Sequence, residues 1–581
     1  MNAGRLLFVG AYRENEVSDV RCLPKMLELF ESSDTINTNS FFLGTFPTEE
    51  PTCEMVSEAL CLPLRLTRSL SKIIHQKSGG SPLYTIEFLD SLLVEKLIAY
   101  DKATGWEWDV DAIDSKKISR GVAELLSLKL QRLPQNVLSA LKVFSCFGAQ
   151  VDIKTINIIK NYDENIGSMM IPALHAAQKE GLVEIAGPTA KFTHDLIQQE
   201  AFDLIPIADR LPLLQKLAGC LINQYFASAE SESTLFVAVD LINRIGRDAV
   251  SNNIAQSQLF ADLNLKAGMK SMVITDFASA VKYFNSGISF LQGNYWNDQY
   301  DVTLGLFVNL ASANYCEGNH ECVTLQVNQV FEHAKSFEDK FKSYLVYINI
   351  LAADSMEEAT EKLFFLLTCL GINIDPNMIT FPMAHADAME VKQILLGNQK
   401  LGILQSCRMT DRTKLMTMEV MAILVGYYSR QRSYMSGFLA CQMIRMSLQY
   451  GHCEHTVLAL SINSVNTLKV LRDPVEACSL ARASLSLVNL YKSDQIIFQI
   501  CAIVYGFVLI FQDSVHSNLD RILKSCQMAF SHGNFEYAVL NTNLYLGRSL
   551  FCGKKLNVLM NEVNAFARQH VSPKLVDFWF L

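Results

Sequence analysis

From about residue 206 to the last residue, small and apolar residues recur at helical spacing in pairs of segments. The pattern is most regular after Gly268, which is followed by Ala280, Phe284 and Gly287 at offsets of 12, 16 and 19 residues. A pair of helices with this pattern cannot bury its apolar face alone, so successive pairs are expected to stack into a superhelix. The sequence therefore predicts an α-helical solenoid over residues 206–581.

Copies of the same frame follow at 304–330 and, more weakly, at 340–366, where Tyr347 replaces the small residue at which two helices would approach closely. The frame is similar to that of the tetratricopeptide repeat, which implies an array whose concave face binds a peptide, a helix or another domain. The 581 residues include only 14 prolines. Because proline interrupts helices, this scarcity also favours a mainly α-helical chain.

A long apolar run, IIFQICAIVYGFVLIF at 496–511, is broken only by Gln499. It is shorter than the roughly 20 residues that cross a bilayer, so we expect a buried solenoid helix rather than a membrane span. The fifteen cysteines include no CxxC pair, and the short apolar run at 6–12 lacks the flanks of a secretory signal. These features predict a reducing, cytoplasmic compartment.

The first 105 residues have a mixed α/β pattern. Short apolar runs at 6–10 and 39–44 are typical of strands that are buried on both faces of a parallel sheet. Arg13 would lie at the carboxyl end of the first strand, where open α/β sheets bind ligands. The segment 78–84 predicts a turn that opens a helix over 85–97.

Residues 106–205 predict several helices followed by a β-hairpin, which is formed by 182–185 and 191–193 around a Gly-Pro turn. This is the plan of a winged helix, and a generic small helical domain with one hairpin is the alternative. Lys179 is the one permanent positive charge of the candidate recognition helix, and the net charge of the chain is −9. Because nucleic-acid binding depends on basic contacts to phosphates, no nucleic-acid partner is expected. The expected helices are 119–132, 137–147, 151–161 and 168–180.

Short motifs for catalysis and nucleotide binding are missing from the chain. It contains no GxxxxGK[ST], GxGxxG, HExxH, GxSxG or HRD sequence. Two histidine- and cysteine-containing clusters, CEGNHEC at 316–322 and GHCEH at 451–455, lack a second ligand pair at zinc spacing. We therefore assign no catalytic residue and no metal ligand.

Several short segments lie in an order that resembles the second half of a STAND-class signalling ATPase, a signal-transduction ATPase of the AAA superfamily. The subgroup that it resembles joins an origin-recognition-like AAA domain to a winged helix and tetratricopeptide-like repeats, as in large multidomain serine/threonine and histidine kinases. The segments that carry the resemblance are GAYRENEV at 10–17, GGSPL at 79–83, WEWD at 106–109, LQRLP at 130–134, FTHDLIQQEA at 192–201 and GNFEYA at 533–538.

By this resemblance, Arg13 matches the sensor arginine that faces the terminal phosphate. Gly80 and Pro82 match the Gly-x-Pro turn that packs the lid against the adenine, and His194 matches the winged-helix histidine that senses ADP. The residues alone also permit plainer roles. Arg13 can solvate the end of a strand, Ser81 and Pro82 can begin a helix as N-cap and first residue, and His194 can cap the last strand of the wing.

The resemblance implies three domains: the C-terminal part of an AAA ATPase domain with its lid at 1–105, a winged helix at 106–205 and a tetratricopeptide-like solenoid at 206–581. The phosphate loop and acidic strand of the family would precede residue 6, so we expect an N-terminally truncated fragment or a degenerate paralogue. ATP or ADP is the implied cofactor, but a chain without a P-loop is not expected to hydrolyse ATP.

The expected function is that of a regulatory or scaffolding part of an ATP-dependent signal-transduction protein. Its partners would be proteins, or other domains of the same assembly, that bind the solenoid of residues 206–581. The alternative is an autonomous helical-repeat adaptor with no nucleotide role.

Overall fold

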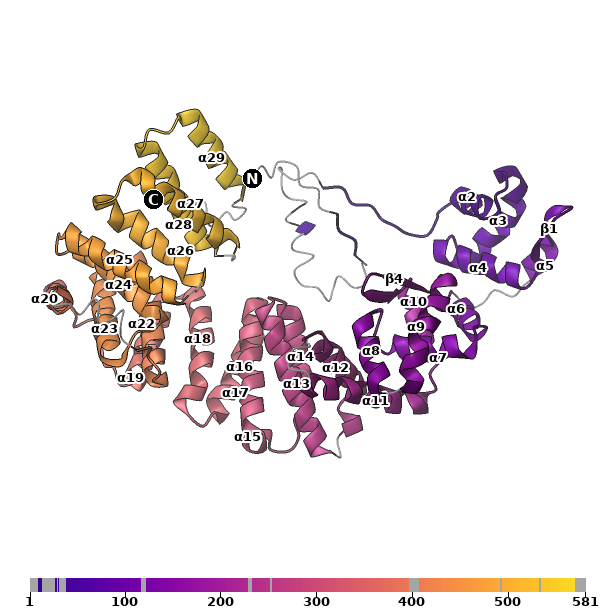
Figure 1. Ribbon diagram of the computed structural model, residues 1–581, viewed down its shortest axis with the longest axis horizontal. Coiled ribbons are helices and arrows are strands. Elements are labelled where there is room, and N and C mark those ends of the chain that lie inside the picture. The colour runs from indigo at the N-terminus through magenta and orange to yellow at the C-terminus, as the bar shows by residue number, and fades with distance from the viewer. Residues whose placement is uncertain are drawn as a thin grey trace. The chain divides into compact units, whose positions relative to one another are not determined.

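The chain is mainly α-helical, as the repeat pattern predicted (Figure 1). It forms two compact units, Met1–Ala249 and Val250–Leu581. The computed structural model describes residues 9–12, 27–28, 30, 38–115, 122–162, 164–227, 232–250, 253–396, 407–431, 433–491, 494–531 and 534–569.

In the first unit, three helices share one apolar core with a short β-hairpin. Val56, Leu70, Ile74, Phe88 and Leu92 are fully buried in this core. The predicted helix 85–97 ends earlier than expected, because the chain turns there and enters the hairpin. The elements are α2 (Glu49–Leu60), α3 (Leu64–Ser78), α4 (Pro82–Val94), β1 (Ile98–Asp101), β2 (Gly105–Trp108) and α5 (Val110–Ser115), with β1 and β2 antiparallel.

The two strands expected near the N-terminus are not formed by the described residues. Residues 9–10 and 39–44 have no strand structure, while 6–8 lie outside the described part of the chain. Val9 is 81% exposed and Leu43 is 93% exposed. A strand is stable only where a neighbour satisfies its backbone N–H and C=O groups. Neither segment is paired with another strand of the described residues, so its apolar side chains gain no burial.

The second core of the first unit lies between helices and a three-stranded antiparallel sheet of order β3-β5-β4. The predicted hairpin is confirmed, and its Phe192 stacks on Phe144 with ring centroids 4.5 Å apart. A third strand takes residues 150–152, where a helix was expected from 151. The elements of this part are α6 (Val122–Gln131), α7 (Gln135–Ser145), β3 (Gln150–Asp152), α8 (Ile153–Tyr162), α9 (Glu164–Lys179), β4 (Val183–Ala186), β5 (Thr189–Phe192) and α10 (Asp195–Asp203). After them come α11 (Ile207–Ala227), α12 (Glu232–Ile245) and η2 (Asp248–Val250), the last of which crosses the boundary between the two units.

The second unit is an array of helices in which each helix packs mainly on its neighbours in sequence, as in a solenoid. Small residues of the predicted frame occupy the contacts between helices: Ala280 is fully buried, and a Cβ at Gly287 would lie 2.7 Å from Leu306 Cδ2. The helices are α13 (Ile254–Val273), α14 (Phe277–Phe290), α15 (Tyr295–Asp298), α16 (Tyr300–Cys316), α17 (His320–His333), α18 (Phe337–Asp354), α19 (Met356–Cys369), α20 (Phe381–Ile394), α22 (Arg412–Arg430), α23 (Tyr434–Tyr450), α24 (Glu454–Lys469), α25 (Pro474–Tyr491), α26 (Asp494–Ile503), η4 (Val504–Val508), η5 (Leu509–Phe511), α27 (Val515–Ser531), α28 (Phe535–Phe551) and α29 (Leu556–Gln569).

The long apolar run at 496–511 forms a buried helix only in part. After α26, the chain widens into a π-helix, η4, and then tightens into a 3₁₀ turn, η5. Val504 and Val508 are fully buried, whereas Phe511 is 57% exposed. No helix in the described part of the chain combines the length and apolar character that a membrane span needs.

Candidate functional site

The predicted nucleotide-sensing residues fall on two parts of the first unit. Arg13 lies outside the described residues. Gly80 lies in the turn between α3 and α4, with φ of +73°, and Pro82 is the first residue of α4. Ser81 is the N-cap of α4, and its hydroxyl accepts a hydrogen bond from the backbone N–H of Tyr84 at 3.4 Å. The turn therefore has the geometry of a helix start.

Gly80 is needed in this turn because another part of the chain crosses it closely. The backbone N–H of Phe46 donates to the Gly80 carbonyl at 2.8 Å. A Cβ at Gly80 would lie 2.3 Å from the Phe46 carbonyl oxygen, which leaves no room for a side chain. Beneath the turn, His75 Nδ1 lies 2.8 Å from the Thr52 hydroxyl and links α3 to α2. These contacts hold the α3–α4 turn against the segment before α2.

His194 is the N-cap of α10. Its Nδ1 lies 3.1 Å from the backbone N–H of Leu196 and 2.7 Å from Asp195 Oδ1. One ring nitrogen cannot accept from the N–H and donate to the carboxylate at the same time. A ring without a proton on Nδ1 caps the helix, whereas a ring with a proton there donates to Asp195, whose Oδ1 also lies 3.0 Å from the Leu196 backbone nitrogen. The side chain is about one-third exposed, so a ligand can reach it.

The described residues do not bring Gly80 and Pro82 into bonded contact with His194. No hydrogen bond or ion pair of the described residues joins them, although α4 and α10 each pack on α6. The two predicted clusters near Cys316 and His452 gather no metal-binding set either: among the described residues, no three His, Cys, Asp or Glu side chains are placed to hold a metal ion. His452 instead hydrogen-bonds the Tyr491 hydroxyl.

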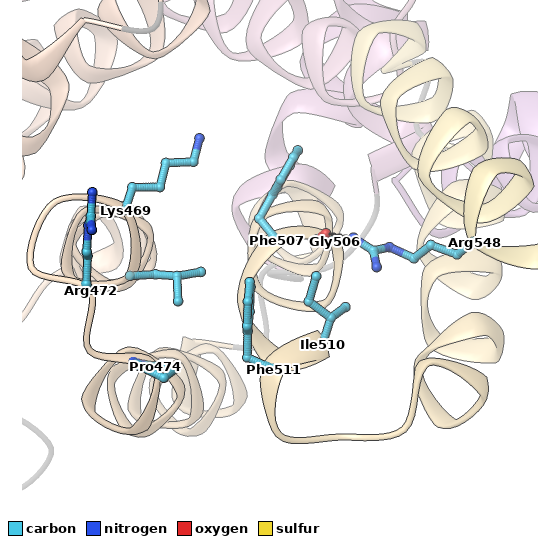
Figure 2. Close-up of a pocket in the computed structure, with 9 residues that line it drawn as sticks. Lys469, Arg472, Pro474, Gly506, Phe507, Ile510, Phe511 and Arg548 are labelled. Carbon is cyan, nitrogen blue, oxygen red and sulfur yellow. Dashed lines mark hydrogen bonds between the residues drawn. The ribbon is translucent and has the colours of Figure 1, made fainter. Parts of the chain in front are cut away.

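A pocket in the second unit was not expected from the sequence. It has a volume of about 470 Å³ and lies between the C-terminal end of α24, the η4–η5 turn and α28. Figure 2 shows Lys469 and Arg472 on one side, Arg548 on the other, and the rings of Phe507 and Phe511 between them. We call it the Arg548 pocket; its lining residues are Leu468, Lys469, Arg472, Pro474, Gly506, Phe507, Ile510, Phe511 and Arg548.

The η4 π-helix shapes this pocket. The extra residue in the turn of η4 leaves Phe507 at the surface, while Val504 and Val508 at the two ends of η4 are buried. Arg548 donates a hydrogen bond to the Gly506 carbonyl, which ties α28 to the π-helix. The close approach of the two helices uses the missing side chain of Gly506, since a Cβ there would lie 2.6 Å from Leu544 Cδ1.

The guanidinium of Arg548 is in an unusual electrostatic position. It is partly buried, and this burial lowers the pKa of Arg548 from its ordinary value. Its Nε is buried and has no hydrogen-bond partner in the described part of the chain. Lys469 Nζ stands 6.0 Å from the centre of the Phe507 ring, within the range of a cation–π contact. The pocket thus combines positively charged side chains with an apolar surface formed by Leu468, Phe507, Ile510 and Phe511.

No family model matches the sequence. Among curated proteins, the chain is similar to Hybrid signal transduction histidine kinase G from Dictyostelium discoideum, with 21% identity over 395 residues. The alignment covers 57% of this chain and 11% of the kinase, so the chain spans about a tenth of the length of this curated relative. Among solved structures, a STAND protein with a tetratricopeptide repeat sensor from Pyrococcus horikoshii has a TM-score of 0.34 and 12% identity, with coverage of 94% of this chain and 75% of that chain.

Proposed function

We propose that this chain is a regulatory and scaffolding part of an ATP-dependent signal-transduction protein of the STAND class. Its working surface is the helical array, which binds protein partners or other domains of the same assembly. The observation that carries the signalling assignment is the similarity over 395 residues to a signal transduction histidine kinase. The helical array supports the binding role, because stacked helices present extended surfaces to other proteins.

The proposal keeps the three predicted domains, 1–105, 106–205 and 206–581. The antiparallel sheet β3-β5-β4 packed on helices α7 and α9 supports a winged helix in the second domain. We assign no ATP hydrolysis to these 581 residues, because they contain no P-loop. We also propose a reducing, cytoplasmic compartment, since every cysteine that the structure describes is a free thiol.

Cross-linking with mass spectrometry tests the binding role. The tagged 581-residue chain is treated in cells with a lysine-reactive cross-linker and purified. We expect a partner protein, or another domain of the same assembly, to be linked to lysines of the second unit. Cross-links to partners confined to residues 38–205 would contradict the assignment of the working surface.

Thermal unfolding with ADP separates the proposal from an autonomous adaptor. A ligand that binds only the folded chain raises its unfolding temperature. We expect ADP to produce such a shift, and the variants Arg13→Ala and His194→Asn to reduce it. Asparagine is a good N-cap, so His194→Asn removes the imidazole and keeps the helix start. Absence of a shift at millimolar ADP would favour the adaptor without a nucleotide role.

A further inference from the structure

The three cations of the Arg548 pocket lack carboxylate partners. Among the described residues, none of Lys469, Arg472 and Arg548 forms an ion pair, and no Asp or Glu lines the pocket. Some cations of the second unit are paired, such as Arg445 with Asp387 at 2.6 Å. On a chain with a net charge of −9, three cations around one cavity with no acidic lining residue form a local concentration of positive charge.

Two carboxylates near the lining residues in sequence are engaged elsewhere. Asp473 lies between two lining residues, but its Oδ2 pairs with Lys392 at 2.8 Å. Asp513 follows η5 and pairs with Arg482 at 2.8 Å. Neither of these two carboxylates therefore pairs with a cation of the pocket. A ligand carboxylate placed there would meet the exposed Lys469 and Arg472 without a competing carboxylate among the lining residues.

The apolar surface of the pocket indicates that its ligand also carries an apolar group. Phe507 is 39% exposed and Phe511 is 57% exposed, beside Leu468 and Ile510. Large side chains left partly exposed in a hollow favour an apolar group of the ligand. Lys469 and Arg472 are also exposed, so the pocket is an open groove that covers one side of its occupant. Small ligands are usually buried over most of their surface, whereas peptides commonly lie across open grooves.

We propose that the Arg548 pocket binds an acidic–apolar peptide segment of a partner protein. One Asp or Glu carboxylate of the peptide lies between Arg548 and the cations of the opposite wall, and a neighbouring large apolar side chain covers Phe507 and Phe511. The exposed Arg472 can pair with the carboxylate through two parallel hydrogen bonds, which fixes the position of the peptide. This inference rests on the proposed function, in which the helical array binds proteins, and it names the chemistry of the partner.

Dye-labelled synthetic peptides test the proposal with the full chain. The probe is a nonapeptide of Gly and Ser with a central Phe-Glu-Phe, and binding is followed by fluorescence anisotropy. Two control peptides replace the Glu by Gln or both Phe residues by Ser. We expect saturable binding of the probe, a loss of at least tenfold in affinity for each control peptide, and weaker binding as salt screens the charges.

Two variants of the chain locate the binding. Arg472→Glu reverses an exposed charge at the pocket, and Arg548→Lys keeps the charge but loses the planar fork. We expect each to weaken probe binding at least tenfold. Lys282→Glu reverses an exposed charge on α14, away from the lining residues, and should leave probe binding unchanged. Circular dichroism checks that all three variants keep the helical content of the parent chain.

Equal binding of the Glu and Gln peptides, or unchanged binding by both pocket variants, would overturn the proposal. Concentration-dependent self-association that Arg472→Glu abolishes would also overturn it, because the occupant would then be a second copy of this chain. If a cross-linked partner is retained by Arg472→Glu while no peptide binds, the pocket assignment fails and the proposed function stands. If peptides bind as expected without any cross-linked partner, the pocket assignment stands and the proposed function fails.

Discussion

Gly268 on α13 lies directly against the ring of Phe284 on α14, so closely that a Cβ on the glycine would stand 2.4 Å from Phe284 Cε1. Phe284 is fully buried. The ring fills the space that the glycine leaves, and this allows the two helices to pack along their length. The spacing of 16 residues seen in the sequence is therefore a direct contact between neighbouring helices.

The substitution Gly268→Ala should destabilise the second unit by about 1–3 kcal/mol, the usual cost of overpacking a filled core. The buried Phe284 ring has to shift to admit the methyl group. Urea unfolding followed by circular dichroism measures the change. The matched control is Gly426→Ala on α22, where a Cβ would meet no atom within 4 Å. It should be neutral or stabilising by up to about 1 kcal/mol, because alanine is the better helix former. Equal stability of the two variants would contradict the contact.

The variants Gly79→Ala and Gly80→Ala should differ although both glycines have positive φ. Each alanine should destabilise the folded chain by about 1–2 kcal/mol, because its backbone must adopt the left-handed conformation. Only at Gly80 does the new Cβ also meet the backbone oxygen of Phe46 at 2.3 Å, while Gly79 faces open space. Hydrogen exchange of the Phe46 amide should therefore accelerate in Gly80→Ala and stay unchanged in Gly79→Ala. If the Phe46 amide stays protected in both variants, the contact between Phe46 and the α3–α4 turn tolerates a side chain at position 80.

Stability should fall in mild acid because of His455 on α24. Burial lowers the pKa of His455, so the folded chain keeps this ring neutral. The unfolded chain binds the proton below an ordinary pKa of about 6.5, and the stability contributed by the neutral ring is lost as pH falls through the folded pKa. The loss is at most about 1.4 kcal/mol for each pH unit in that window.

Urea unfolding between pH 7.5 and pH 5 tests this prediction for His455→Gln. The variant should show a flatter decline than the parent chain. His516→Gln, which replaces an exposed ring on α27, serves as the control and should follow the parent curve. A parallel decline of parent and His455→Gln would exclude the buried imidazole as the cause.

Buried cysteines should react with iodoacetamide more slowly than exposed cysteines. Burial raises the pKa of Cys146 to about 12 and that of Cys501 to about 11. Because the thiolate is the reactive form, iodoacetamide at pH 8 should label the exposed Cys61 and Cys369 and leave Cys146 and Cys501 unmodified. Peptide mass spectrometry reads the labelled sites, and full labelling in urea is the control. Rapid labelling of Cys501 in the native chain would contradict its position in the core.

The helical array could be predicted from the sequence because helix packing leaves a local signature. Positions such as Gly268, Ala280 and Gly287 must be small wherever two helices approach, and the 3.6-residue period brings them to one face. The hairpin at 183–192 could be predicted from the sequence for a similar reason, because its turn and its alternating residues are neighbours in the chain. The run at 39–44 has the composition of a strand but no partner among the described residues, and a partner is what a strand requires.

The amino-acid sequence by itself determined where helices form, which residues are small at their contacts, and that no P-loop is present. Only the tertiary structure brought Arg472, Phe507 and Arg548 to one pocket. No sequence periodicity relates the three segments that carry these residues. In the sequence, each residue is typical of an ordinary surface position. Their meeting depends on the stacking of α24 and α28 around the π-helix η4, which is decided by long-range packing rather than by any local pattern.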